Sequence, residues 1–351
     1  MARLRDIAER AGTSIAAVSL VLNDRADSAR ISEKTRTAVL DAARQLGYSP
    51  NLTARRLRAH GHRRRSLVVG LALPVDSRLS LVSRTVSGMQ RRLADLSEEF
   101  DSDVQLTLET FRPGQLHRLR GVGEPVWFNG LVVGNTSTED DAFLDAHRGT
   151  VPLVVFQRQL ERQSTVDADN HAASVGVAQH LGGLGHRSLA IVTPGMNSQV
   201  QRLRYDGFVE GLRAAGLGPP EHVVAPGDGW TSSAYAATDA LLARPVAERP
   251  TAVFATNDLI ALGVMRAAHD RGLRMPVDLA VVGFDDAEFA PYTIPALTSV
   301  HLPVEEMAAA AVDVLLDLIQ RRIDVPAHRL LPTRLVVRES CGARKEEKDN
   351  G

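Results

Sequence analysis

The chain has 351 residues, of which 44% are hydrophobic, 24% are charged and one, Cys341, is a cysteine. This length and apolar content predict two or three domains with buried cores, and a single cysteine excludes a disulfide framework or a multi-cysteine metal site. No run of 18 apolar residues predicts a membrane span. Asp6, Glu9 and Arg10 interrupt any apolar signal segment, so we expect a reducing, cytoplasmic location and no membrane partner.

The net charge of −1 conceals an uneven distribution. Residues 1–65 hold 14 Arg and Lys against 6 Asp and Glu, whereas the rest of the chain holds 27 against 36. Because phosphates attract clustered cations, a basic N-terminal segment on an acidic body favours nucleic-acid binding. Chance variation of surface charge also produces such a difference, so the motifs must decide.

Residues 1–50 show helical periodicity only, in three short stretches. Gly12 ends the first helix, Ser14 can cap the second, and Ser32 opens the third, which Gly47 ends. The predicted buried positions are Leu4, Ile7, Ala8, Ala11, Val18, Val21, Leu22, Val39, Ala42, Ala43 and Leu46. Two helices joined by a tight turn and backed by a third fit a helix-turn-helix DNA-binding domain.

The outward face of the second helix is the predicted surface for DNA base readout. It carries Ile15, Ala16, Ser19 and Leu20. Apolar side chains cannot bond base edges, but they can pack on thymine methyl groups. In the alternative interpretation, Leu20 belongs to the small core and reads nothing. Predicted phosphate contacts, which set register without reading sequence, are Ser14, Asn23, Ser32, Thr35 and Asn51.

Residues 51–65 form a basic linker with few apolar side chains. Arg55, Arg56 and Arg58 flank Leu57. So short a helix is mostly disordered alone in water. The segment is either a plain linker or a hinge that folds against phosphates, and the sequence leaves both open.

From residue 66 to residue 340, apolar strand-like runs alternate with helical patterns. The strand-like runs are SLVVGLAL, VQLTLE, GLVVG and PLVVF, then SLAIVT, HVVAP, TAVFAT and LAVVGF. This alternation predicts two α/β lobes with parallel sheets covered on both faces. Such sheets bind ligands beyond the carboxyl ends of their strands, here in the cleft between the lobes.

These residues resemble the LacI (lactose-repressor-type) family of transcriptional regulators over nearly the whole chain. The head matches the family pattern from Asp6 to Asn23, and the motifs at Ser32–Arg36, Leu46–Asn51 and Ala54–Leu57 follow. In the body, VDADN, HLGGLGHRSLAIV, RYDGF, TAVFATNDLIALGVM, LAVVGFDD and PALTSVHLP stand in the family's order.

The resemblance implies a repressor with a periplasmic-binding-protein-like core, which binds a pseudo-palindromic operator as a dimer. It implies three crossings between lobes, near Gln163, Pro291 and Arg322. The expected N-lobe is residues 66–162 and 292–322, the C-lobe is residues 163–291 and 323–340, and residues 341–351 are a charged, disordered tail without heptads. It also implies that Ile15, Ala16 and Leu20 select the operator, and that Leu57 wedges between base steps in the minor groove.

The resemblance places a small-molecule effector in the cleft, held by Arg204, Asn257 and Asp285. The Arg204 guanidinium donates hydrogen bonds, the Asp285 carboxylate accepts them and the Asn257 amide does both, which suits the paired hydroxyl groups of a sugar. Trp230 and Phe156 could stack on the sugar ring. Helix capping by Asn257, a turn at Asp285 and a core position for Phe156 are the alternatives. The chain departs from the common Asn-Pro-Phe-Phe at Leu79–Val82 and from a common Asp at Gln157, so a nucleoside, a sugar phosphate or another metabolite stays possible.

An enzyme or a transport-type binding protein with the same core is the alternative class. The eleven histidines show no metal-ligand spacing, and neither a nucleophile elbow nor a cofactor loop occurs, so we expect no catalytic residue, metal or cofactor. The absence of a signal segment and the basic head disfavour a transport protein. A protein co-regulator in place of a small molecule is a third alternative.

Overall fold

The computed structural model describes residues 4–22, 31–45, 66–100, 103–119, 122, 129–146, 151–225, 230–323 and 326–342. The chain divides into two compact units, an N-terminal head and a larger α/β core, and each is described by itself.

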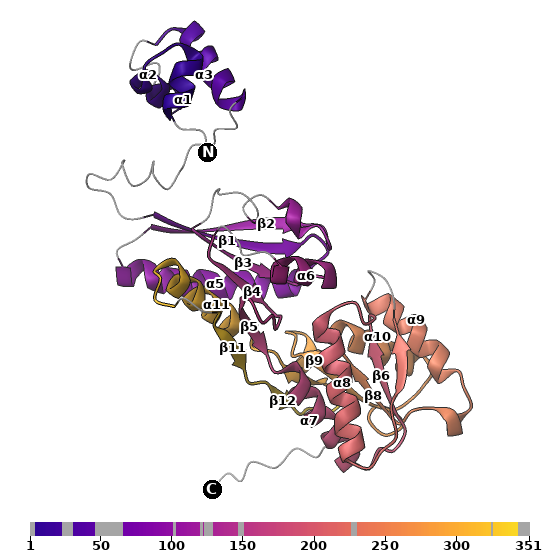
Figure 1. The fold of residues 1–351 in the computed structure, drawn as a ribbon. Coiled ribbons are helices and arrows are strands. Elements are labelled where there is room, and N and C mark those ends of the chain that lie inside the picture. Colours follow the sequence, from indigo (N-terminus) through magenta and orange to yellow (C-terminus); the bar gives the residue numbers. More distant parts are fainter. Residues whose placement is uncertain are drawn as a thin grey trace. The chain divides into compact units, whose positions relative to one another are not determined.

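The head is a trihelical unit of α1 (Leu4–Ala11), α2 (Ile15–Leu22) and α3 (Glu33–Gln45) (Figure 1). Its core contains Ile7, Ala8, Val18, Val21, Val39 and Ala42, with Ala11 and Ile31 packed against them. The predicted apolar stripes are therefore confirmed at these positions. The side chains of Leu4, Leu22, Ala43 and Leu46 lie outside the described residues.

The turn between α1 and α2 is built as the sequence predicts. Gly12 has a φ of 61°, a left-handed conformation that glycine adopts without steric cost. Ser14 Oγ accepts a hydrogen bond from the Ala17 amide at 3.1 Å, which caps the first turn of α2. The short, tight connection lets the stripes of the two helices meet.

The first six-stranded sheet of the core defines the N-lobe, with strand order β11-β5-β4-β3-β1-β2 (Figure 1). Its strands are β1 (Ser66–Pro74), β2 (Asp103–Phe111), β3 (Gly130–Gly134), β4 (Leu153–Phe156), β5 (Ser164–Ala168) and β11 (His328–Leu331). The pairs β1–β3, β3–β4, β4–β5 and β5–β11 are parallel. The helices are α5 (Leu79–Phe100), α6 (Thr138–Ala146), α11 (Val304–Ile319) and the short η1 (Leu116–Arg118).

The second sheet defines the C-lobe, with strand order β12-β10-β9-β8-β6-β7. Its strands are β6 (Leu189–Thr193), β7 (Glu221–Val224), β8 (Ala252–Ala255), β9 (Ala280–Asp285), β10 (Thr298–His301) and β12 (Arg334–Val336). All pairs are parallel except the antiparallel pair β10–β12. The helices are α7 (Asn170–Gly183), α8 (Gln199–Ala214), α9 (Trp230–Leu242) and α10 (Asp258–Asp270), with η2 (Val246–Glu248) and η3 (Ala290–Tyr292).

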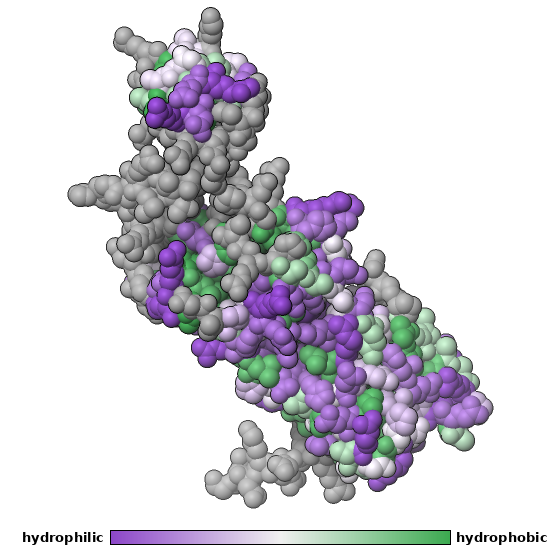
Figure 2. All heavy atoms as spheres, in the orientation of Figure 1, coloured by the Kyte–Doolittle hydropathy of each residue, from purple (hydrophilic) through white to green (hydrophobic). Residues whose placement is uncertain are grey.

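The strands are buried because helices cover both faces of each sheet. Strands β3, β4, β5, β6, β8 and β9 are buried at every position, which explains their continuous apolar runs. Figure 2 shows mainly hydrophilic residues on the visible surface of the described core, with hydrophobic residues singly or in small groups between them. The predicted two-lobed α/β fold with parallel sheets is confirmed.

The three crossings between the lobes lie farther along the chain than we expected. The sequence predicts them near Gln163, Pro291 and Arg322, whereas the structure has them between β5 and β6, between β10 and α11, and between β11 and β12. Residues 164–168 and 328–331 therefore belong to the N-lobe sheet, and residues 298–301 to the C-lobe sheet. These strands are short and partly polar, so their own pattern does not reveal which sheet they join.

The ordered C-lobe extends past residue 340, where we expected the tail to begin. Cys341 is buried in the core, and its Sγ accepts a hydrogen bond from Thr298 Oγ at 3.2 Å. Cys341 is thus a packing residue, and Gly342 is the last residue that the structure describes. Among the described helices, none combines the length and apolar character needed to cross a bilayer.

Candidate functional site

The outer face of α2 is the candidate DNA-reading surface of the head. Ile15 is 50% exposed, and Ala16 is also exposed. Leu20 is half-buried, so it is neither a fully exposed reading residue nor a fully buried core residue. An exposed large apolar side chain at the start of a helix is available for contact with another molecule.

The structure gives Ser14, Ser32 and Thr35 a local role as well as the predicted phosphate contact. Ser14 caps α2, and Ser32 Oγ accepts a hydrogen bond from the Thr35 amide at 3.2 Å at the start of α3. Their phosphate contacts stay predictions. The side chain of Ser19 and the residues Asn23, Asn51, Arg55, Arg56, Leu57 and Arg58 lie outside the described residues, so their predicted roles also stay predictions.

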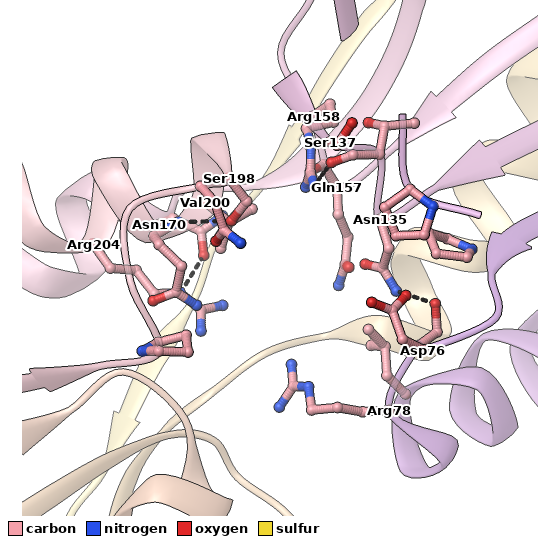
Figure 3. Close-up of a pocket in the computed structure, with 18 of the residues that line it drawn as sticks. Asp76, Arg78, Asn135, Ser137, Gln157, Arg158, Asn170, Ser198, Val200 and Arg204 are labelled. Atoms are coloured by element: carbon pink, nitrogen blue, oxygen red, sulfur yellow. Dashed lines mark hydrogen bonds between the residues drawn. The ribbon is translucent and has the colours of Figure 1, made fainter. Parts of the chain in front are cut away.

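A cavity of about 350 Å³ lies between the two lobes of the core, within the size range of small-molecule sites. Loops that follow the carboxyl ends of β1, β3, β4 and β6 line it, together with residues of β5 and of α7, α8 and α9. Figure 3 shows Asp76, Asn135 and Gln157 facing Ser198 and Arg204 across this space. The cleft that the fold class predicts between the lobes is therefore present as a cavity, and most of the residues that line it are polar.

The backbone is strained where strands end at this region. Asn135 (φ 55°) and Gln157 (φ 60°) directly follow β3 and β4, and Asp285 (φ 117°) and Asp286 (φ 53°) stand at the end of β9. Left-handed conformations cost free energy for residues with a Cβ and concentrate at binding sites. They turn the chain sharply, so that side chains after each strand face the space between the lobes.

Arg204 is the most buried cation of the site. Its Nε donates to Asn170 Oδ1 at 2.9 Å, one terminal nitrogen donates to the Thr256 carbonyl at 2.6 Å, and the guanidinium lies 3.5 Å from the centroid of the Phe284 ring. Burial lowers the pKa of Arg204 to about 10, although nearby Asp285, 3.8 Å away, favours the charged form. Arg204 therefore stays protonated at neutral pH in a fixed orientation.

A hydrogen-bonded chain links Arg204 to the N-lobe. Asn170 Nδ2 donates to Asp167 Oδ1 at 3.2 Å, and Gln159 Nε2 donates to Asp167 Oδ2 at 3.2 Å. Burial raises the pKa of Asp167, and the positive charges of Arg158 and Arg204 partly offset this increase. Asp167 and Asn170 belong to the VDADN motif, and the pattern of that motif alone indicates no role for either residue in the site.

Arg78 reaches across the cleft from the loop after β1 and is the principal residue that sequence reasoning missed. It forms an ion pair with Asp285, and its guanidinium lies 5.6 Å from the centroid of the Trp230 ring. Both partners belong to the C-lobe and were predicted to contact the effector. The only sequence signal was a charged residue just before the atypical segment Leu79–Val82.

The structure does not bring all five predicted effector residues to the cavity wall. Arg204 and Trp230 line it, and Asp285 touches Arg78 beside it. Phe156 is 1% exposed and packs in the hydrophobic core, and Asn257 Oδ1 caps α10 by accepting from the Ile260 amide at 2.9 Å. In this structure Phe156 is therefore a core residue and Asn257 is a helix cap, which are the alternatives to effector contact that the sequence left open.

Comparison with known proteins identifies the chain's relatives. The family description "Bacterial regulatory proteins, lacI family" matches residues 3–51, and "Periplasmic binding protein-like domain" matches residues 178–341. The HTH-type transcriptional regulator AscG of Escherichia coli is 33% identical over 318 residues, which cover 88% of this chain and 89% of AscG. The chain belongs to the LacI family. CelR of Thermobifida fusca, another HTH-type transcriptional regulator, is 33% identical over 343 residues, 96% of this chain and 97% of CelR.

Solved structures of LacI-family proteins share the architecture. A CelR–cellobiose complex has a TM-score of 0.69 at 29% identity and covers 97% of this chain and 100% of that chain. The lac repressor dimer bound to operator and an anti-inducer has a TM-score of 0.67 at 28% identity and covers 97% and 99%. This LacI-family chain is therefore a transcriptional regulator with a helix-turn-helix DNA-binding head and a periplasmic-binding-protein-like core.

Proposed function

We propose that this regulator acts as a dimeric repressor whose affinity for its operator is set by a sugar or sugar derivative bound between the lobes. One observation supports this most: the cavity between the lobes, with Arg204 and Trp230 in its wall and Asp285 beside it. Relatives with names such as ribose operon repressor and a cellobiose complex support the same ligand class. The ligand is bound and released without chemical change.

The composition of the wall favours a neutral, hydroxyl-rich ligand. Arg204 supplies donors, Asp76 and Asn135 supply acceptors, and Trp230 supplies an aromatic face for the C–H side of a ring. Cations and carboxylates are both present around the cavity, so a ligand need not bring a charge to balance the site. Hydroxyl groups satisfy donors and acceptors alike, which suits such a wall.

On the DNA side, we propose that Ile15, Ala16 and Leu20 read base edges through apolar contacts. The exposure of Ile15 and Ala16 supports this. Phosphate contacts from Ser14, Asn23, Ser32, Thr35 and Asn51 would supply affinity. The hinge at residues 51–65, with Leu57, Arg55, Arg56 and Arg58, would bend the operator. A dimer would place two heads on two half-sites.

The test couples DNA selection to ligand response. DNA bound by the full-length protein is selected from a random pool, and its affinity is followed by fluorescence anisotropy with a panel of sugars and nucleosides. We expect an inverted-repeat motif and at least one sugar that changes DNA affinity by about 5–150-fold. Arg204→Met should keep the DNA affinity of the free protein and lose the response, whereas Arg213→Met, an exposed position on the same helix, should keep both.

Different results would contradict sequence-specific repression, the sugar class of effector and the small-molecule effector itself. A selected pool without a shared motif would reject sequence-specific repression. A response to nucleosides alone would reject the sugar class, and a wild-type protein that responds to no small molecule would favour a protein co-regulator instead.

A further inference from the structure

Three carboxylates of the C-lobe stand together where β9 ends. Asp285 is the last residue of β9, Asp286 follows it, and Asp258 is the first residue of α10 beside them. A Cβ at Gly283 of β9 would overlap Asp258 Oδ1, so this carboxylate packs directly against the strand. Carboxylates held this close repel one another, and their ionisation therefore depends on the cations around them.

Asp258 is the member of this cluster that is bonded to neutral groups. Ser299 Oγ and the Ala287 amide donate to it, both at 2.6 Å, and its side chain is buried. Both donors belong to the C-lobe, as does β9, so Asp258 keeps these partners when the lobes move apart. Burial raises the pKa of Asp258 to about 7, so this carboxyl exchanges a proton with the solvent near neutral pH.

The cations that the C-lobe itself contributes lie beside the other two carboxylates. Arg338 pairs with Asp286 at 2.6 Å, and His301 Nδ1 lies 3.0 Å from the same carboxylate. Arg204 stands 3.8 Å from Asp285. These groups stay with the cluster wherever the N-lobe moves.

The N-lobe contributes two arginines to the same place. Arg78 forms an ion pair with Asp285, and Arg84 donates to the Asp285 carbonyl at 3.2 Å while Glu305 holds its guanidinium at 2.8 and 2.9 Å. Glu288, an exposed carboxylate in the loop after β9, lines a cavity that both arginines also line. An opposite charge within about 4–6 Å favours the ionised form of a carboxyl group. The two arginines therefore favour ionised carboxylates only while the lobes are together.

We propose that separation of the lobes is linked to the uptake of one proton from the solvent at Asp258, so that acid favours the open core and alkali the closed core. When the lobes separate, Arg78 and Arg84 leave with their own protons, and the carboxylates keep only the cations of the C-lobe. Protonation of Asp258 then relieves the repulsion within the cluster. The linkage is a property of the ligand-free core and does not depend on the class of effector.

The experiment follows lobe separation in the ligand-free, full-length protein as the pH falls from about 9 to about 6, the range in which the two forms differ in bound protons. Trp230 emission, read in a Trp127→Phe background, reports separation because the Arg78 guanidinium lies 5.6 Å from the centroid of its ring. We expect the emission to shift to longer wavelength and the radius of gyration from small-angle scattering to increase. An increase of about tenfold in the ratio of open to closed molecules corresponds to a tenfold difference in proton affinity between the two forms.

Two variants assign the proton to Asp258. Asp258→Asn, which is neutral throughout this range, should show the long-wavelength emission at every pH. Histidine side chains ordinarily titrate near neutral pH, so His301→Gln is the second test, and it should keep the wild-type response. Asp206→Asn, an exposed position on α8, is the control and should also follow the wild type.

A wild-type protein with constant emission and radius over this range would overturn the linkage. A response that survives in Asp258→Asn, or one that disappears in His301→Gln, would assign the proton to another group and overturn it as well. If circular dichroism shows that Asp258→Asn does not fold, Arg78→Gln replaces it. Loss of the pH response in Arg78→Gln supports the linkage, and a full response contradicts it.

Discussion

Asp258 is a buried carboxylate at the start of α10, between the end of β9 and the loop that follows it. Burial raises its pKa to about 7, and the neighbouring Asp285 and Asp286 carboxylates add to this effect. The hydrogen bonds from Ser299 and the Ala287 amide favour the charged form, but they do not overcome burial. The protonation state of Asp258 therefore makes its hydrogen bonds to the loop after β9 and to β10 depend on the pH of the solution.

We predict that Asp258 makes the folded protein less stable as the pH rises from about 4 to about 7. Its folded-state pKa exceeds the ordinary value of 3.8, so over this range the native state retains a proton that the unfolded chain releases. Urea denaturation followed by circular dichroism should show the free energy of unfolding falling with pH, and Asp258→Asn should reduce that slope.

Burial also raises the pKa values of Asp141 and Asp167. The free energy of unfolding of Asp258→Asn should therefore still fall with pH, but less steeply than that of the wild type. Asp206→Asn, an exposed position, is the control and should follow the wild-type curve. Identical slopes in Asp258→Asn and wild type would show that Asp258 is ionised in the folded protein.

At the scale of elements, α7 and α8 pack closely because glycines stand on the facing side of α8. A Cβ at Gly207 would lie 2.3 Å from the His171 carbonyl oxygen, and one at Gly211 would lie 2.7 Å from the Val175 carbonyl oxygen. Backbone atoms cannot move aside as a flexible side chain can. The small residues of RYDGFVEGLRAAG thus set the distance between the helices and hold Arg204 near Asn170.

We predict that Gly207→Ala lowers the free energy of unfolding by about 1–3 kcal/mol, because the helices must separate to admit the methyl group. Gly176→Ala on α7 is the matched control, since a Cβ there meets nothing within 4 Å. The control should raise stability by about 0.5–1 kcal/mol through helix propensity. Chemical denaturation measures the free energy of unfolding of both variants and of the wild type. A Gly207→Ala protein as stable as the wild type would show that the two helices can move apart without cost.

At the scale of the whole core, side chains rather than the crossing strands alone connect the lobes around the cavity. Arg78 bridges from the N-lobe to Asp285 and Trp230. Gln159 and Gln199 exchange two hydrogen bonds at 2.8 and 2.9 Å, and Asn170, which holds Arg204, donates to Asp167 on the N-lobe strand β5 at 3.2 Å. A ligand that competes for these groups changes how the lobes are held, which gives the regulator a physical means of responding.

We predict that Arg78→Gln loosens the ligand-free core, because the ion pair and the ring contact are lost together. Small-angle scattering should show a larger radius of gyration than for wild type, and Trp230 fluorescence, read in a Trp127→Phe background, should shift to longer wavelength. Arg213→Gln, exposed on α8, should change neither signal. An unchanged radius with a shifted emission would mean that Arg78 shields Trp230 without holding the lobes.

The sequence by itself determined what depends on neighbouring residues along the chain. Helical stripes such as Ile7, Ala8 and Ala11, the cap at Ser14 and the alternation of apolar strands with helices are local patterns, and the structure confirms them. Family motifs extended this to the two-lobed core and to Arg204, and the chemistry of aromatic stacking suggested Trp230; both residues line the cavity.

Only the tertiary structure decided which distant residues meet. The sheet membership of β5, β10, β11 and β12 depends on pairing with strands far along the chain, so the crossings between the lobes moved from their expected positions. Arg78 reaches Asp285 across 207 positions of sequence, and Cys341 packs in the core rather than opening a tail. Such contacts depend on loop conformation and on packing in the folded chain, so no local sequence pattern predicts them.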